Sequence, residues 1–399
     1  MSTVLKDTGW GIRYAGFIIC FTAFLLMLPG VLPAQVRTGA EHTASYFPLL
    51  IGKKIGIVAN SSSAMGNINI VDFLIQKGFN VQRIFSPEHG FRLNAEAGQT
   101  LAGGIDSATG IPVVSLYGSQ RKPNVSDLKS LDIVLFDIQD VGVRFYTYIS
   151  TLSLVMEACA ENNIPLILLD RPNPNGFYID GPILEPEFKS FVGLHPVPVV
   201  YGMTIGEYAC MVNGEKWLKN QVQCDLTVIR LTNYTHRTKC DLPLKPSPNL
   251  PNLNAVYLYP SLCFFEGTTI SIGRGTSFPF EVIGHPEMKS GTFFFTPRSI
   301  PGASLHPPFE GQECRGIDLR GYLLKYPDQQ GKLNLTWLLE TFHDFNKDPL
   351  FFTGYFDKLA GNATLQQQIK AGKSENEIRK SWQAGIDVFR KIRAKYLLY

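Results

Sequence analysis

The chain has 399 residues, with 37 basic and 34 acidic side chains and a formal net charge of +3. Because the charges nearly balance and no basic run or tail occurs, the composition argues against nucleic acid as a partner and favours a small or neutral ligand. The length suits two domains.

The first 34 residues are typical of a secretory signal peptide. Lys6 and Arg13 provide a basic start, residues 14–28 are almost wholly apolar, and Pro33 precedes the small residue Ala34. An uncleaved membrane anchor is the alternative, but the apolar run is short for a span of about 20 residues. We therefore expect an exported protein, periplasmic or secreted, with no stable membrane partner after cleavage.

Six strands are predicted after the leader. Short β-branched runs bounded by polar residues, Gly or Pro occur at residues 55–59, 81–85, 113–116, 133–138, 166–169 and 226–229. Several runs are continuous rather than alternating, which is typical of strands covered on both faces. Helical periodicity appears between them at residues 71–78, 148–159 and 205–218, with Thr204 as the expected N-cap of the last. This alternation predicts an α/β fold with a doubly wound parallel sheet.

The pattern changes near residue 241. Five prolines punctuate residues 243–260, where no helical period is visible, and helical patterns return near residues 335–345 and 360–398. This change predicts a domain boundary within residues 240–262. We accordingly divide the chain into a first domain at residues 45–255 and a second, smaller α+β domain at residues 256–399.

The cysteines give no sign of a metal site. Six of the seven follow the leader, at positions 159, 210, 224, 240, 263 and 314, and none forms a CxxC pair. An exported protein could oxidise some of them, but packing in the core is the default expectation for most. The sequence assigns no disulfide pairs.

Polar residues cluster where the predicted strands end. In open α/β sheets, ligands bind outside the carboxyl ends of the strands, so these residues are the candidates for a site. They are Asn60 after the first strand, Glu88, His89 and Arg92 after the second, Asp140, Arg144 and Tyr146 after the fourth, and Arg171 and Asn173 after the fifth.

Glu88 is the foremost catalytic candidate. It follows a strand directly and lies between Pro87 and His89, where partial desolvation favours the protonated form that a general acid needs. A turn carboxylate bonded to the backbone is the alternative. His89 could carry a second proton, bind substrate or be structural, and the absence of HExxH spacing argues against a metal role.

The residues after the fourth and fifth strands allow two interpretations. Asp140 and Arg144 either belong to the site or form a structural ion-paired cluster with Asp137. Arg171 offers a planar fork suited to a carboxylate, or pairs structurally with Asp170. Tyr146 could position a sugar, and the proline-rich loop that holds Asn173 is rigid enough to orient a binding group.

The second half adds three candidate residues. Asn249 lies in a stiff polar segment at residues 246–252. Glu266 and Arg274 could close the site from the second domain, or the glycines around Arg274 could simply form a hairpin turn. No GxGxxG or P-loop motif occurs, so no nucleotide cofactor is expected, and the absence of GxSxG argues against an esterase.

Five motifs carry a family resemblance. They are SPEHGFR at 86–92, DIQDVGVRFYTY at 137–148, DRPNP at 170–174, PSPNLP at 246–251 and GRGT at 273–276. In content and order they resemble the NamZ-type exo-β-N-acetylmuramidases, glycoside hydrolase family 171, long known only as a domain of unknown function. Asn69 and Leu93 depart from the family pattern as we know it.

The resemblance implies a Rossmann-like catalytic domain, a smaller C-terminal domain and a cleft between them. It implies release of N-acetylmuramic acid (MurNAc) from the non-reducing end of peptidoglycan, with MurNAc–GlcNAc or longer fragments as substrates and Glu88 as the catalytic glutamate. An arginine such as Arg144, Arg171 or Arg274 could bind the lactyl carboxylate of MurNAc. A non-catalytic muropeptide- or glycan-binding protein using the same cleft is the main alternative, but it would not need Glu88.

Overall fold

The computed structural model describes residues 1, 35–92, 103–345 and 350–399, so the predicted signal peptide and Leu93 lie outside the described residues. The chain divides into two units, Met1–Gln35 and Val36–Tyr399. The fold below is that of Val36–Tyr399. Among the described residues, no helix has the length and apolar character needed to cross a membrane.

A sheet of seven strands forms the centre of the first part of this unit. Its order is β5-β6-β4-β1-β7-β8-β9, and every neighbouring pair is parallel except β5 and β6. In chain order the parallel strands run 3-2-1-4-5-6, the order of Rossmann folds. The strands are β1 (Lys54–Ala59), β4 (Asn80–Ser86), β5 (Gly104–Ile105), β6 (Pro112–Ser115), β7 (Ile133–Asp137), β8 (Leu166–Leu169) and β9 (Leu226–Ile229). The predicted fold class is confirmed.

Both faces of the sheet are covered, which explains the continuous apolar runs of its strands. Ile57 and Leu135 pack in one layer with α2 (Thr43–Leu50) and α3 (Ile70–Gln76). Val58 and Phe136 point to the opposite layer, with α5 (Tyr148–Glu161) and α6 (Ile205–Gly214). Because successive side chains in a strand face opposite sides, a strand buried on both faces has no polar position to alternate with.

The predicted start of α6 is correct and its predicted end is not. Thr204 is the N-cap, and its side chain accepts a hydrogen bond from the backbone N–H of Glu207 in a capping box. The helix ends at Gly214 rather than at residue 218, since Lys216 adopts a left-handed φ of 56°. The short helix α4 (Val125–Leu128) lies between β6 and β7.

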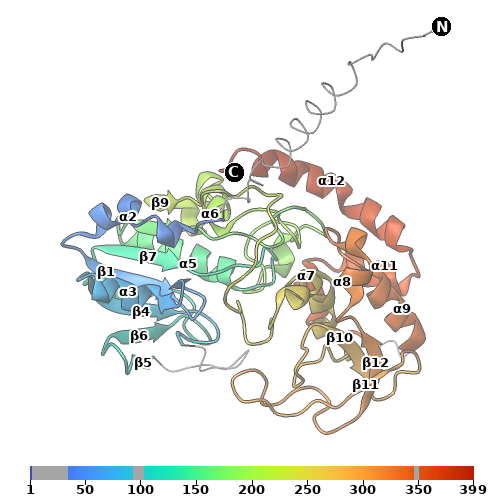
Figure 1. Cartoon of the computed structure of the whole chain (residues 1–399). Helices are drawn as coiled ribbons and strands as arrows, with labels where there is room; N and C mark the ends of the chain where they lie inside the picture. The colour runs from blue at the N-terminus through green and yellow to red at the C-terminus, as the bar shows by residue number, and fades with distance from the viewer. Residues whose placement is uncertain (2–34, 93–102, 346–349) are drawn as a thin grey trace. The chain divides into compact units, whose positions relative to one another are not determined.

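The second part of the unit has its own antiparallel sheet. Its strand order is β10-β12-β11, from β10 (Val282–His285), β11 (Phe293–Phe295) and β12 (Cys314–Asp318). Six helices accompany it: α7 (Leu253–Leu262), α8 (Tyr322–Lys325), α9 (Thr336–Phe345), α10 (Phe356–Ala360), α11 (Thr364–Lys370) and α12 (Glu375–Arg393). Figure 1 shows this part beside the parallel sheet.

The remaining elements are short. A two-stranded ribbon pairs β2 (Ala64–Met65) with β3 (Ile68–Asn69) after β1. Single turns of 3₁₀ helix are η1 (Gly39–Glu41), η2 (Pro186–Phe188), η3 (Lys219–Gln221), η4 (Cys263–Gly267) and η5 (Pro327–Gln329).

Two expectations for the second part require correction. The proline-rich stretch contains a helix, α7, which Asn252 caps by accepting from the N–H of Ala255, and which keeps Pro260 inside it. The pattern at residues 360–398 is two helices, α11 and α12, because Gly372 adopts a positive φ and ends α11; α10 already ends at Ala360. The predicted division between residues 255 and 256 falls inside α7 and stays a prediction.

Helix α12 and the residues after it return to the first part. A guanidinium nitrogen of Arg379 lies 2.7 Å from Oδ2 of Asp180, and Nε of Arg393 donates to the carbonyl of Gly202 over 2.9 Å. The hydroxyl of Tyr399 donates to the buried carboxyl of Asp170, at the end of β8, over 2.7 Å. The six cysteines after residue 34 form no disulfide with one another, and five of them are buried.

Candidate active site

A cavity of about 610 Å³ lies at the carboxyl edge of the parallel sheet. One wall comes from the loops after β4, β6 and β7, which contribute Glu88, Tyr117 and Thr147. The facing wall comes from the second part, including Glu266 and Tyr355. The cavity is therefore built from segments that are distant in the sequence, at the edge where α/β sheets bind their ligands.

Glu88 is oriented in this cavity by a hydrogen bond from a neighbouring loop. It follows β4 by two residues and is partly buried. The hydroxyl of Thr147 donates to its Oε2 over 2.9 Å, and Tyr117 lines the same cavity. The carboxyl group is thus oriented by a residue from the loop after β7 while it lines the cavity.

The backbone turns sharply beside Glu88. His89 has a φ of 72° and Gly90 a φ of 77°, so two successive residues are left-handed. For histidine this conformation is uncommon, and such backbone strain is concentrated at functional sites. The imidazole is buried, and its Nε2 lies 3.2 Å from Oγ of Ser247, so the strained turn is tied to the PSPNLP segment.

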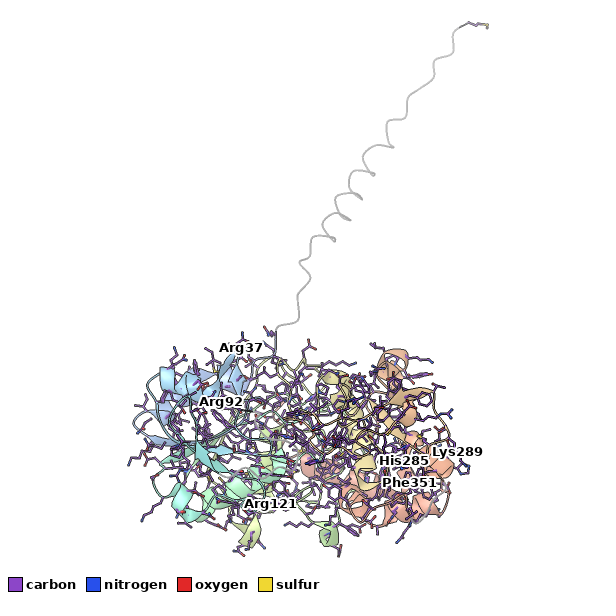
Figure 2. The ribbon with its side chains drawn as sticks, turned by 90° about the horizontal axis from the view of Figure 1, so that it is seen from below. Arg37, Arg92, Arg121, His285, Lys289 and Phe351 are labelled. Carbon is purple, nitrogen blue, oxygen red and sulfur yellow. The ribbon has the colours of Figure 1, made fainter. Side chains whose placement is uncertain are left out.

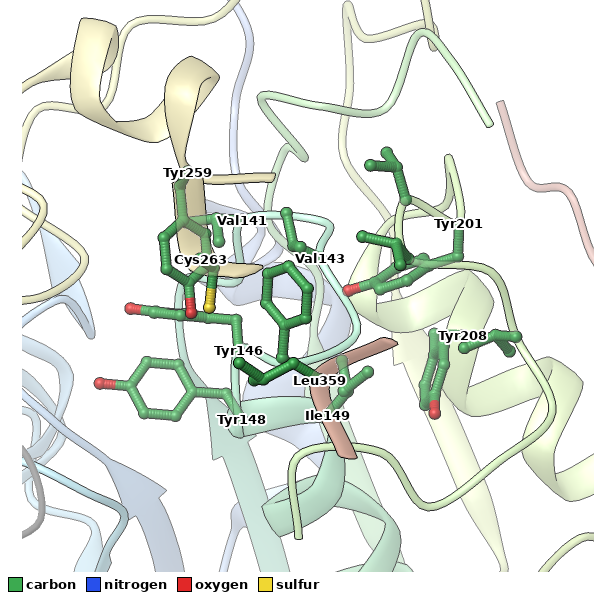
Figure 3. Close-up of a cluster of buried hydrophobic side chains, with 14 of the residues drawn as sticks. Val141, Val143, Tyr146, Tyr148, Ile149, Tyr201, Tyr208, Tyr259, Cys263 and Leu359 are labelled. Carbon is green, nitrogen blue, oxygen red and sulfur yellow. The ribbon is translucent and has the colours of Figure 1, made fainter. Parts of the chain in front are cut away.

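Neutral phenols surround Glu88. Burial is the main cause of a raised pKa in Tyr117, Tyr146, Tyr148 and Tyr355, and the negative charge of Glu88 raises each pKa further. These side chains therefore stay protonated and able to donate hydrogen bonds. Figure 3 shows Tyr146 and Tyr148 side by side with their hydroxyls directed the same way, and their ring centroids are 4.7 Å apart.

Glu266 and Arg274 form an ion pair in the facing wall. Nε and a terminal nitrogen of Arg274 lie 2.8 Å and 2.6 Å from Oε1 of Glu266. The guanidinium also lies over the ring of Phe280, 5.1 Å from its centroid. Gly273 and Gly275 have positive φ, so the segment is a tight turn and also brings both charged residues into the cavity. The segment is thus a turn, as one interpretation predicted, and its Arg274 also lines the cavity, as the other predicted.

The described residues contain no group of three or more His, Cys, Asp or Glu side chains placed to hold a metal ion. The chemistry that the cavity walls offer is that of carboxyl, phenol and cationic groups.

Comparison with known proteins identifies the family. The family model for the N-terminal part of the exo-β-N-acetylmuramidase NamZ matches residues 55–254, and the model for its C-terminal part matches residues 257–399. The chain belongs to the NamZ family. It is 41% identical over 385 residues to the peptidoglycan β-N-acetylmuramidase NamZ of Bacillus subtilis (strain 168), covering 92% of each chain.

Two solved structures of DUF1343 family proteins from Bacteroides fragilis NCTC 9343 are similar to this NamZ-family chain. One is 47% identical with a TM-score of 0.85, and the other is 27% identical with a TM-score of 0.75. Each alignment covers 92% of this chain and 99% of the solved one. The resemblance predicted from the five motifs is confirmed.

Half of the residues predicted for the site line the cavity of this NamZ-family chain, and half do not. Those lining the cavity are Glu88, His89, Tyr146, Asn249, Glu266 and Arg274. Those that do not line it are Asn60, Arg92, Asp140, Arg144, Arg171 and Asn173. Each residue of the second set forms side-chain hydrogen bonds to other protein groups.

The structure does not support a direct catalytic role for Asp140. The carboxyl is buried, and its Oδ2 accepts hydrogen bonds from the hydroxyl of Tyr201 and from the N–H of Gly142. Burial raises its pKa to about 6, against the opposing effect of these hydrogen bonds. The residue stabilises the loop after β7 from within.

Arg144 is structural, which corrects its prediction as a substrate ligand. Its side chain is fully buried, and its terminal nitrogens donate to the carbonyls of Pro182, Val197, Leu359 and Ala360 over 2.7–2.9 Å. Because these carbonyls come from both parts of the unit, Arg144 joins α10 to the first part. No donor on its two terminal nitrogens is directed to the cavity.

Arg171 and Asn173 are also structural. Arg171 forms a buried ion pair with Asp137, with Nε and Oδ1 2.5 Å apart. Its predicted pairing partner, Asp170, accepts instead from Thr204 and Tyr399. Asn173 donates to the carbonyl of Met203 over 2.7 Å.

Asn60 and Arg92 do not line the cavity but bind other protein side chains. Asn60 donates to the hydroxyl of Tyr148 over 2.9 Å, so it positions a residue of the wall. Arg92 binds the carboxylates of Asp72 and Asp106. Asn69, the departure from the family pattern, caps α3 by accepting from the N–H of Val71.

Several cavity residues were missed as site candidates. Thr147 and Tyr148 lie within the DIQDVGVRFYTY motif, and Tyr117 and Arg121 follow the third predicted strand, so strand-end position was a usable signal for all four. Tyr355 and Lys358 belong to the second part, where no strand end points to them.

Proposed function

We propose that the chain is an exo-acting β-N-acetylmuramidase that releases MurNAc from the non-reducing end of peptidoglycan fragments. The observation that carries the proposal is Glu88, a carboxyl group oriented by Thr147 in a tyrosine-lined cavity at the carboxyl edge of a Rossmann-like sheet. The relative from Bacillus subtilis, 41% identical, is a peptidoglycan β-N-acetylmuramidase. MurNAc–GlcNAc and longer fragments are the proposed substrates.

In the proposed reaction Glu88 protonates the glycosidic oxygen as the bond to MurNAc breaks. Its hydrogen bond from Thr147 restricts the orientation of the carboxyl group, and a restricted geometry lowers the entropic part of the barrier. Glycoside hydrolysis usually employs a second carboxyl group. Within the described residues, Glu266 is the other carboxyl group that lines the cavity. We therefore assign Glu266 the role of the second catalytic carboxyl group.

The phenols of the cavity suit a sugar substrate. Tyr117, Tyr146, Tyr148 and Tyr355 combine flat apolar rings with protonated hydroxyls, which match the apolar faces and the hydroxyl groups of a pyranose. A carboxyl group among such rings is partly shielded from water, so its proton transfer is directed to the bound substrate.

The proposed place of action is outside the cytoplasm, in the periplasm or the medium. The support is the leader pattern of residues 1–34, with its basic start and apolar run. Mass spectrometry of the protein recovered from its host checks this: a mature chain that begins near residue 35 is expected, and an intact leader contradicts export by cleavage.

Replacing Glu88 by Gln tests the proposed function. The amide keeps the size of the side chain but has no acidic proton, and general acid catalysis typically contributes roughly 10²–10⁴-fold. We expect kcat on MurNAc–GlcNAc to fall by about that factor while the melting temperature changes little. A nitrophenyl β-MurNAc glycoside, whose leaving group needs little protonation, should lose much less activity.

The matched control is Glu340→Gln, an exposed glutamate on α9 outside the cavity, which should leave kcat unchanged. Equal losses on both substrates would point to a nucleophile rather than an acid at position 88. Normal turnover by Glu88→Gln would exclude a catalytic role for this residue. A wild-type protein that binds the disaccharide and leaves it intact in mass spectra would be a glycan-binding protein instead.

A further inference from the structure

Three cationic side chains line the cavity, and they differ in what surrounds them. Arg274 is neutralised by Glu266, which contacts two of its nitrogens. Arg121 and Lys358 form no ion pair with any described residue, and both are exposed. Among the described residues of the cavity, these two therefore have positive charge available for a ligand.

Arg121 is pre-oriented by an aromatic ring. Its guanidinium carbon lies 4.6 Å from the ring centroid of Phe191, which also lines the cavity. Phe191 packs in turn against Tyr117, with ring centroids 6.1 Å apart. A guanidinium held over an aromatic ring keeps its N–H edge available for a planar anion, and it loses less entropy on binding than a flexible lysine does.

Arg121 is also close to the catalytic candidate. Tyr117, whose ring packs against Phe191, lines the same cavity as Glu88 and Arg121. The negative charge of Glu88 raises the pKa of the Tyr117 hydroxyl, and the positive charge of Arg121 lowers it. Figure 2 shows Arg121 on the part that carries the parallel sheet, with His285 and Phe351 on the opposite part. Arg121 and Glu88 thus belong to one wall of the cavity, connected through one tyrosine.

The proposed substrate carries one group that this arrangement fits. MurNAc differs from N-acetylglucosamine by a lactyl ether on O3, which ends in a carboxylate. Moving a carboxylate from water into a cavity of phenols costs free energy unless a cation meets it, and Arg binds carboxylates through two parallel hydrogen bonds. The carbon that bears O3 is two ring positions from C1, so the lactyl carboxylate needs a cation beside Glu88 and not at Glu88 itself.

We propose that Arg121 binds the lactyl carboxylate of MurNAc and so makes the cavity selective for muramic acid over N-acetylglucosamine. This inference rests on the proposed function. It replaces Arg144 and Arg171, whose guanidinium groups are occupied by buried protein partners. Lys358, on α10 in the facing wall, carries one charge on a flexible stem and is the competing candidate.

The test compares Arg121→Gln with the wild type on two ligands. For nitrophenyl β-MurNAc we expect KM to rise about tenfold or more, the usual loss for a charge-assisted contact, with kcat within about threefold. Inhibition by free MurNAc should weaken by a similar factor, whereas inhibition by N-acetylglucosamine should stay unchanged. Arg121→Lys should recover part of the lost affinity because it restores the charge without the fork.

Arg37→Gln is the matched control, because Arg37 is also an exposed arginine but does not line the cavity, and Figure 2 places it away from Arg121. An equal loss of affinity for MurNAc and N-acetylglucosamine in Arg121→Gln would overturn the inference. So would a MurNAc-selective loss in Lys358→Met with none in Arg121→Gln. Failure of the proposed function looks different: the wild type itself would then leave nitrophenyl β-MurNAc and the disaccharide intact.

Discussion

At the scale of single residues, burial separates the charged groups that support the fold from those that serve the site. Arg144 and Asp140 lie in the same loop as Tyr146 and Thr147, yet the first two are buried away from the cavity and the last two line it. A buried charge needs partners, and here the protein supplies them: four carbonyls for Arg144 and the hydroxyl of Tyr201 for Asp140.

Asp140 gives the stability of the protein a specific dependence on pH. Its pKa in the folded protein is about 6, above the ordinary value of 3.8, so between these values the folded chain binds a proton that the unfolded chain has released. The contribution of Asp140 to stability therefore falls as pH rises from about 4 to 6. A shift of about two pKa units corresponds to on the order of 3 kcal/mol.

We expect Asp140→Asn, which does not titrate, to gain stability relative to the wild type by about that amount between pH 4 and pH 7. Urea unfolding of both proteins across this range measures the difference. His195, whose pKa burial lowers to about 3, changes stability in the opposite direction, but it is present in both proteins and cancels. The exposed Asp241→Asn is the control, and a pH-independent difference for Asp140→Asn would contradict the expectation.

At the scale of elements, the first part of the fold was predictable because its strands are buried on both faces. Every parallel strand was predicted from a short β-branched run, several of them continuously apolar, and Thr204 was recognisable as a cap. Helix α7 was missed because Pro260 and the prolines before it obscure its period. Helices α11 and α12 were merged because a positive φ at Gly372 is a property of the fold that no periodic pattern records.

The site was predictable to a similar degree and for a similar reason. Strand ends indicate which edge binds ligand, so Glu88, Tyr146 and their neighbours could be selected. Strand ends do not indicate which side chains face the cavity and which face the interior, since that depends on long-range partners. Arg144 is the clearest example, because two of its four acceptors, at residues 359 and 360, lie far away in the sequence.

Gly361 ends α10 beside Arg144, and its position predicts how an alanine substitution there changes stability. Its φ is 78°, and an added Cβ would lie 2.7 Å from a terminal nitrogen of Arg144 and 3.0 Å from Cα of Leu184. Gly372 ends α11 with a similar φ of 68°, but an added Cβ there meets nothing within 4 Å. The two positions share the backbone strain and differ in the available space.

We expect Gly372→Ala to lower the free energy of unfolding by about 1 kcal/mol, the cost of a left-handed alanine. Gly361→Ala should lower it by about 2–4 kcal/mol, because the Arg144 hydrogen bonds must also shift. Chemical denaturation of the two variants beside the wild type measures both values. Equal losses would show that the contact with Arg144 carries no energy of its own.

At the scale of the whole unit, the two parts are joined by charges and by the chain that follows α11. Arg144 binds carbonyls on both sides, and Arg379 of α12 binds Asp180. Tyr399 reaches Asp170 at the carboxyl end of β8. Such interlocking favours one cooperative transition over independent unfolding of two domains.

We expect a single unfolding transition for residues 36–399. Trp217 lies in the first part, and Trp337 and Trp382 lie in the second, so tryptophan fluorescence of Trp217→Phe reports the second part alone while circular dichroism reports the whole. Coincident midpoints in urea are the expected outcome. Two separated midpoints would mean that the parts are stable independently and that the contacts of Arg144 and α12 couple them only weakly.

The cavity walls come from segments that are far apart in the chain, and this affects when catalytic activity returns during refolding. Glu88, Glu266 and Tyr355 enter one site only after the second part has docked on the sheet. Helices such as α5 and α12 depend on local contacts, which form faster than contacts between distant segments. Turnover should consequently return after the far-ultraviolet helix signal has recovered. Refolding molecules can then have native secondary structure before they have catalytic activity.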